Sequence, residues 1–143
     1  MRLPFLCAAA VLALAAAGCS RSDPERELRA TIGAMSSAIE QRQPAAFLDS
    51  LADDFTREAA AFDKTEARRL LAGVMLRNAR ITLTTVVQDV RIVGDRAEVR
   101  MRVLATGGEG LLPERGQAWD VETAWRRTGG KWQLYNADWR AAL

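Results

Sequence analysis

The feature that most constrains this fold is a change of hydrophobic period at Arg80. Before that residue, apolar side chains recur three or four positions apart, as on one face of a helix. After it they alternate along two segments, 80–93 and 96–105, which are rich in Val, Ile and Thr. The pair Gly94-Asp95 between the segments is typical of a two-residue hairpin turn. We therefore expect helices first and an antiparallel sheet after them.

A two-residue turn sets the register of this first hairpin. The pairs it predicts are Val93 with Arg96, Ile92 with Ala97, Arg91 with Glu98, Val90 with Val99, Asp89 with Arg100 and Val86 with Val103. One face is then apolar, and the other has two pairs of opposite charge, both of which favour the register. Ile81 and Leu83 have the opposite phase to Val86. This indicates either a bulge near the middle of the strand or a second covered face, as in a dimer.

A second hairpin is predicted over 117–128 and 131–139, joined by the turn pair Gly129-Gly130. The connection between the hairpins, 106–116, contains four glycines and is long for a link between strands. Long loops are often functional.

The first helix has two candidate starts. Asp23 is an N-cap with Pro24 at the first helical position, or Ser22 and Glu25 form a capping box. The apolar stripe behind either start predicts a helix that continues to about Gln41.

Two further helices precede the sheet. Pro44 begins the second, residues 53–56 follow as a turn into a brief extended segment, and a capping box of Asp63 and Glu66 begins a third helix that ends near Asn78. Helices segregated from strands predict an α+β fold, with the helices packed on one face of an antiparallel sheet.

Three features resemble the NTF2-like superfamily, which includes SnoaL-like and ketosteroid-isomerase-like proteins. They are the stretch Leu51-Ala-Asp-Asp-Phe55, the capped third helix and the closing pattern from Trp125 to Trp139. The resemblance covers residues 24–139. It implies a cone in which a curved sheet of about four to six strands wraps around three helices, often with a pocket, and frequent dimerisation through the sheet. It implies no single chemistry.

Residues 1–18 have the parts of an export signal, with Arg2 ahead of an apolar run of about 15 residues. The run is shorter than the ~20 residues of a spanning helix, although a retained short anchor is the alternative. The stretch from Leu14 to Ser20 resembles the bacterial lipobox. The resemblance implies cleavage before Cys19 and acylation of its thiol, palmitate included.

Lipidation at Cys19 predicts a membrane-anchored protein. The lipidated Cys and a short tether occupy 19–23, and the domain occupies 24–143. Three or four linker residues reach only about 10–14 Å, so we expect the domain close to the lipid surface. Ser20 after the Cys fits the lipoprotein rule for sorting to the outer membrane, facing the periplasm.

Composition excludes several classes of function. The chain has no His, and Cys19 is the only Cys beyond the signal, so we expect no metal site, no cofactor and no internal disulfide. The 20 basic and 18 acidic side chains form no basic stripe, and we expect no nucleic-acid partner.

The last hairpin supplies the candidate ligand contacts. With Val121 opposite Asp138 and Trp125 opposite Leu134, one face combines aromatic rings with a few polar groups, as in a ligand pocket. The candidates on that face are Trp119, Thr123, Trp125, Trp132, Asn136 and Asp138. The structural alternative is that the tryptophans are core and the polar groups bind backbone.

Three hypotheses for function follow. The first is a noncatalytic domain that binds a small apolar ligand or a partner protein. The second is an isomerase or dehydratase with Asp138 as a desolvated base and Tyr135 or Asn136 as polariser, although alternation points Tyr135 to the other face. The third is a structural module that dimerises through that other face, where Tyr135 and Trp139 are expected.

Overall fold

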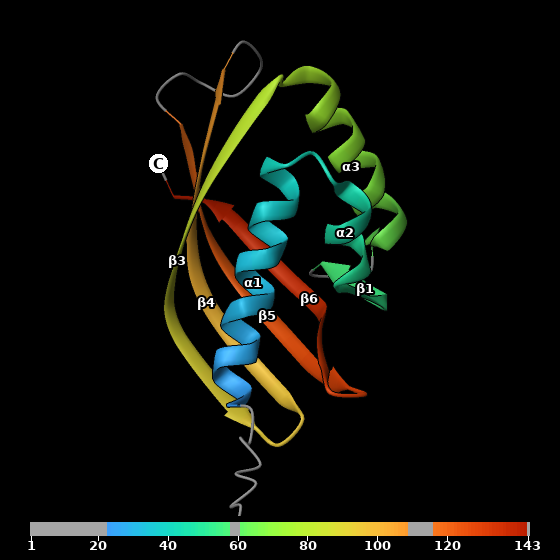
Figure 1. The fold of residues 1–143 in the computed structure, drawn as a ribbon, viewed down its shortest axis with the longest axis vertical. Helices are drawn as coiled ribbons and strands as arrows, with labels where there is room; N and C mark the ends of the chain where they lie inside the picture. Colours follow the sequence, from blue (N-terminus) through green and yellow to red (C-terminus); the bar gives the residue numbers. More distant parts are fainter. Residues whose placement is uncertain (1–22, 58–60, 109–115, 143) are drawn as a thin grey trace, which may run out of the picture.

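The computed structural model describes residues 23–57, 61–108 and 116–142 (Figure 1). The elements are α1 (Pro24–Glu40), α2 (Pro44–Asp49), β1 (Leu51–Arg57), β2 (Phe62–Asp63), α3 (Lys64–Arg77), β3 (Arg80–Val93), β4 (Arg96–Gly108), β5 (Gln117–Thr128) and β6 (Lys131–Ala141). Three helices and a sheet in this arrangement confirm the α+β prediction. The predicted export signal, Cys19, its tether and the middle of the 106–116 connection lie outside the described residues. None of the helices described is long and apolar enough to cross a bilayer.

The helices begin where the capping residues predict. The Asp23 carboxylate accepts a hydrogen bond from the Glu25 backbone N–H at 3.0 Å, and Pro24 occupies the first helical position of α1. The Asp63 carboxylate accepts from the Glu66 N–H at 2.9 Å at the start of α3. The alternative start at Ser22 lies outside the described residues. Local hydrogen bonding therefore sets these boundaries.

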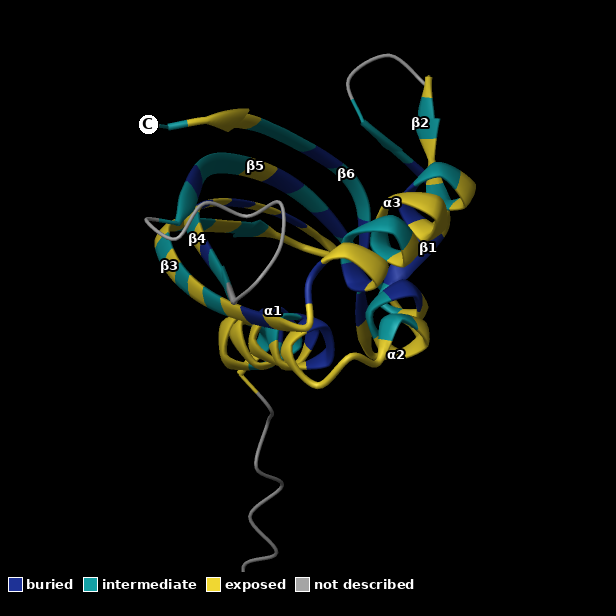
Figure 2. Cartoon of the chain, turned by 90° about the horizontal axis from the view of Figure 1, so that it is seen from above, coloured by how far each residue is buried: buried dark blue, intermediate teal, exposed yellow. Residues whose placement is uncertain are grey.

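The six strands form one sheet in the order β2-β1-β6-β5-β4-β3. Neighbouring strands are antiparallel except β1 and β6, which run parallel. The expectation of a purely antiparallel sheet was wrong here, because β1 pairs with β6 in parallel. Asp53 and Asp54, which were predicted in a turn, lie in β1. The sheet bends around the helices, which lie on its concave side (Figures 1 and 2). The helices therefore cover the concave face of the sheet (Figure 2).

The first hairpin contains the predicted bulge. Pairing follows the predicted register from the turn to Asp89 opposite Arg100, and then shifts by one residue across Gln88. Val86 consequently pairs with Arg102, and its predicted pairing with Val103 was wrong. Val86 is 55% exposed on the convex face. The bulge explains the change of phase within the strand without a second covered face.

The second hairpin contains a bulge that the sequence analysis missed. Trp125 pairs with Leu134 as predicted, but Tyr135 is an extra residue in β6. Beyond it, Val121 pairs with Trp139 and not with Asp138. A one-residue shift moves every following side chain to the opposite face, which brings Trp139 to the concave side.

The core lies between the concave face and the helices. Its most buried large side chains are Trp125, Leu28, Leu51 and Val99, each no more than 2% exposed. They come from β5, α1, β1 and β4, so the core joins the helical and sheet layers of one domain.

Candidate functional site

A cavity of about 230 Å³ lies between the concave face of the sheet and the three helices. Its lining includes Ile32 and Met35 of α1 and Trp125 of β5, which are all buried. It also includes Leu70 of α3, which is 49% exposed. The cavity therefore extends from the core to the surface. Phe62 and Trp139, which also line it, are partly buried.

Only three polar side chains, all hydroxyls, are found among the described lining residues. Ser36 Oγ lies 3.0 Å from Thr85 Oγ1, so these two hydroxyls hydrogen-bond each other. Thr123 Oγ1 donates to the Val99 carbonyl at 2.9 Å and accepts from Trp125 Nε1 at 2.8 Å. Each hydroxyl thus has a partner within the protein, and the wall that a ligand meets is apolar.

The structure places two of the six predicted contact residues, Thr123 and Trp125, on the cavity wall. Trp132 is buried in the core instead, where its Nε1 donates to the Pro24 carbonyl at 3.0 Å and connects β6 to the start of α1. Trp119 lies on the concave face opposite Val103 but is not part of the lining.

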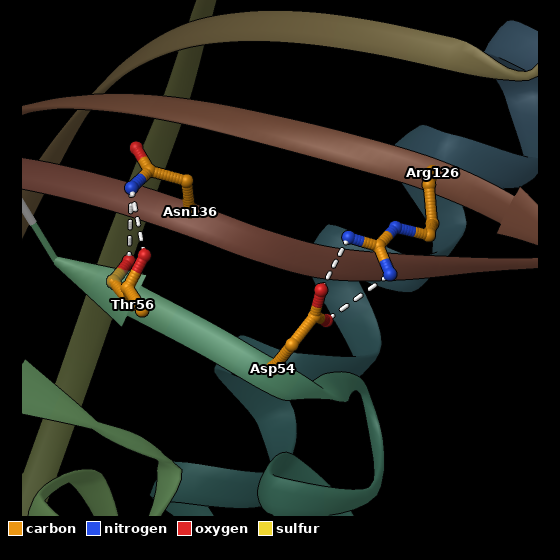
Figure 3. Close-up of polar contacts among 4 residues, drawn as sticks. All are labelled: Asp54, Thr56, Arg126 and Asn136. Atoms are coloured by element: carbon orange, nitrogen blue, oxygen red, sulfur yellow. Dashed lines mark hydrogen bonds and ion pairs between the residues drawn. The ribbon is translucent and has the colours of Figure 1, made fainter. Parts of the chain in front are cut away.

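Asn136 and Asp138 do not face the cavity, which corrects the prediction. They lie beyond the Tyr135 bulge and therefore point to the convex face. Asn136 Nδ2 donates to the Thr56 carbonyl at 3.1 Å and connects β6 to β1 (Figure 3). Asp138 lies opposite Glu122 and lines a polar groove on the convex side. A base at Asp138 has no access to the apolar cavity.

Trp139 is a site residue that the sequence analysis assigned to the wrong face. It lines the cavity, and the Phe62 ring meets it edge-on with centroids 5.4 Å apart. A sequence signal for this placement exists. Leu134 and Ala137 lie on opposite phases of one strand although both are apolar, as Ile81 and Val90 do in the first hairpin. The same reasoning applied twice would have located both bulges.

Two arginines connect β1 to its neighbours in the sheet, Arg57 from β1 to β6 and Arg126 from β5 to β1. Arg57 Nη2 donates to the Trp139 carbonyl at 2.8 Å, and its guanidinium lies 4.0 Å from the Trp139 ring centroid. Arg126 forms two hydrogen bonds with the Asp54 carboxylate, at 3.1 and 2.8 Å (Figure 3). These hydrogen bonds and the charge of Arg126 lower the pKa of Asp54.

Metal chemistry has no obvious site in the part of the chain that the structure describes. No three Cys, Asp or Glu side chains cluster there. The cavity is therefore the strongest candidate site, and its chemistry is apolar contact.

No family model matches the chain, and no curated protein matches it by sequence. Solved structures do match. A candidate scytalone dehydratase from Novosphingobium aromaticivorans has a TM-score of 0.70 at 13% identity, covering 83% of this chain and 84% of that one. A hexachlorocyclohexane dehydrochlorinase, LinA-type3, from Novosphingobium barchaimii has a TM-score of 0.67 at 16% identity, covering 83% and 86%. An NTF2-like protein of unknown function from Pseudomonas putida has a TM-score of 0.64 at 20% identity, covering 83% and 87%.

Structural similarity at identities this low shows a common fold, and it does not transfer the activities of those proteins to this chain. In this chain the fold consists of a curved sheet with the helices on its concave face (Figure 2). The chain has the NTF2-like fold, with six strands wrapped around three helices.

Proposed function

We propose that this protein is a noncatalytic domain that binds a small apolar molecule in the cavity. The observation that carries the proposal is the lining, in which every hydroxyl already has a hydrogen-bond partner and the remaining described side chains are aliphatic or aromatic. Such a wall binds a ligand by excluding water from apolar surface, at about 25 cal/mol per Å².

The size of the cavity limits the ligand. An engineered apolar cavity of ~150 Å³ binds benzene, whereas pockets for drug-sized ligands span roughly 300–1,000 Å³. At about 230 Å³, this cavity fits one ring with a few additional carbons. We expect a ligand of that size.

The noncatalytic part of the proposal rests on the same lining. Isomerases and dehydratases that move protons need a titratable group within hydrogen-bond reach of the substrate. The described lining offers hydroxyls that donate and accept within the protein, and Asp138 lies on the other face of the sheet. Binding needs no such group.

Ligand binding is tested with 4-phenylbutanol as the probe and thermal unfolding as the measurement. A ligand at one hundred times its dissociation constant stabilises the folded state by about 2.7 kcal/mol, so the unfolding midpoint should rise. Val121→Phe adds volume on the cavity wall and should abolish the rise. The matched control, Val93→Phe, changes a side chain that is 72% exposed and should leave the rise intact. An equal rise in both variants, or none in the wild type, would contradict the proposal.

We further propose that the domain is anchored to the outer membrane through Cys19, facing the periplasm. Support comes from the lipobox-like stretch that ends at Ser20. Cys19→Ser should move the protein from the membrane fraction to the soluble fraction and abolish labelling by a palmitate analogue. Cys7→Ser is the matched control and should do neither. A Cys19→Ser protein that stays labelled would exclude this anchor.

A further inference from the structure

Three arginines of the described chain have a buried Nε without a hydrogen-bond partner: Arg57, Arg126 and Arg127. Each guanidinium lies over an aromatic ring, at 4.0, 4.7 and 5.9 Å from the ring centroid respectively. Stacking of this kind removes water from the cation, and a desolvated cation is costly unless an anion compensates it.

Two of the three are compensated. Arg126 pairs with the Asp54 carboxylate at 2.8 Å, and Arg127 pairs with the Glu27 carboxylate. Arg57 differs, because no ion pair between described residues includes it and its hydrogen bond goes to the neutral Trp139 carbonyl. Among the described residues, Arg57 therefore lacks the carboxylate partner that Arg126 and Arg127 have.

Arg57 lies beside residues that line the cavity. It follows Phe55 by two positions on β1, and alternation places both side chains on the same face. It pairs with Phe62 in the sheet and stacks on Trp139. Phe55, Phe62 and Trp139 all line the cavity. A ligand that fills the cavity and extends past these side chains would thus reach this guanidinium.

We propose that the ligand is a small amphiphilic carboxylate, with its apolar part in the cavity and its carboxylate paired with Arg57. This inference rests on the ligand-binding function proposed above and names its ligand class. Guanidinium groups match carboxylates in geometry and charge, and hydrogen bonds between charged partners are stronger than neutral ones. The ligand carboxylate would pair with Arg57 as the Asp54 carboxylate pairs with Arg126.

The test compares three probes that share one apolar body: 4-phenylbutyrate, 4-phenylbutanol and 4-phenylbutylamine. Binding to the purified Cys19→Ser chain, which lacks the proposed lipid, is measured by calorimetry in detergent-free buffer. Tryptophan fluorescence is a second readout because Trp125 and Trp139 line the cavity. We expect the carboxylate to bind about tenfold more tightly than the alcohol, and the amine to bind most weakly.

Arg57→Gln should weaken 4-phenylbutyrate about tenfold and leave 4-phenylbutanol within about twofold, so that the preference disappears. Arg57→Lys keeps the charge and should keep part of the preference. The control is Arg140→Gln, which removes a cation from the convex face, where it pairs with Glu122. That variant should bind all three probes as the wild type does.

Each other outcome overturns the inference. Equal affinity for the carboxylate and the alcohol in the wild type would exclude a role for Arg57 in recognition and leave the apolar-ligand function standing. A folded Arg57→Gln protein that loses both probes equally would show that Arg57 only supports the cavity wall. Binding of none of the probes would overturn the proposed function together with the inference. If Arg57→Gln does not fold, the wild-type ratio of carboxylate to amine decides, and a ratio near one overturns the proposal.

Discussion

The two faces of the sheet are made by alternate residues of the same strands, yet they differ sharply in what they contribute. On the concave face, Trp125 and Val99 are each 1% exposed and pack against the helices. On the convex face, charged side chains pair across neighbouring strands, as Arg100 does with Asp89, and both side chains stay more than half exposed. Burial of a large apolar side chain contributes several kcal/mol, whereas an exposed ion pair contributes ~0–1 kcal/mol. The concave face therefore contributes most of the stability, and the ion pairs of the convex face contribute little.

The largest effect should come from Trp125→Ala on the concave face. Removal of a fully buried tryptophan should lower the free energy of unfolding by about 3–5 kcal/mol, because a cavity is left behind. Urea denaturation measures the change. Val93→Ala, at a side chain that is 72% exposed, should change it by less than ~0.5 kcal/mol. Similar losses of unfolding free energy in the two variants would contradict the claim that the concave face contributes more to stability than the convex face.

Thr123→Val should have the next largest effect, at about 1–3 kcal/mol. Valine has nearly the same shape, but it leaves the buried Trp125 Nε1 without its acceptor at 2.8 Å. Trp125→Phe removes that donor, so it should cost less in the Thr123→Val background than in the wild type. A double-mutant cycle from urea denaturation measures this coupling, and strictly additive costs would refute it.

Asp54→Asn tests an ion pair at the edge where β1 meets the rest of the sheet. Arg126 lowers the pKa of Asp54 in the folded protein, so the pair stabilises the fold above the unfolded pKa of about 3.9. That contribution is lost as pH falls through the lowered folded pKa. The Asp54 side chain is 63% exposed, so solvent and salt limit the loss in Asp54→Asn to less than ~1 kcal/mol at neutral pH.

Unfolding curves of Asp54→Asn and the wild type across acidic pH provide the measurement, and they should converge below the folded pKa. In an Arg126→Gln background, Asp54→Asn should have no such pH-dependent cost. A pH dependence that survives Arg126→Gln would assign the effect to another group.

The smallest effect should come from the convex ion pair of Asp89 and Arg100, whose charged atoms lie 3.7 Å apart. A double-mutant cycle with alanine at both positions should give a coupling of about 0.2–0.5 kcal/mol at low salt and almost none at 1 M salt. A coupling above ~1.5 kcal/mol would mean that the convex face contributes to stability as the concave face does.

The sequence by itself determined the features that depend on local interactions. The Asp23 and Asp63 caps begin α1 and α3 because each carboxylate binds a backbone N–H two or three residues away. The Gly94-Asp95 turn predicted the register of the first hairpin as far as Asp89, because a short turn dictates the pairs next to it. Those interactions need no information from the rest of the chain.

Only the tertiary structure decided the features that depend on distant packing. The parallel pairing of β1 with β6 requires α2 to bring β1 alongside a strand more than seventy residues later, near Leu51 opposite Leu134. The Tyr135 bulge likewise depends on which side chains the helices cover. It separates the two predicted contact residues that line the cavity from two of those that do not. Thr123 and Trp125 belong to β5, which has no bulge, and both line the cavity. Asn136 and Asp138 follow the bulge in β6, and the one-residue shift turned them away from it.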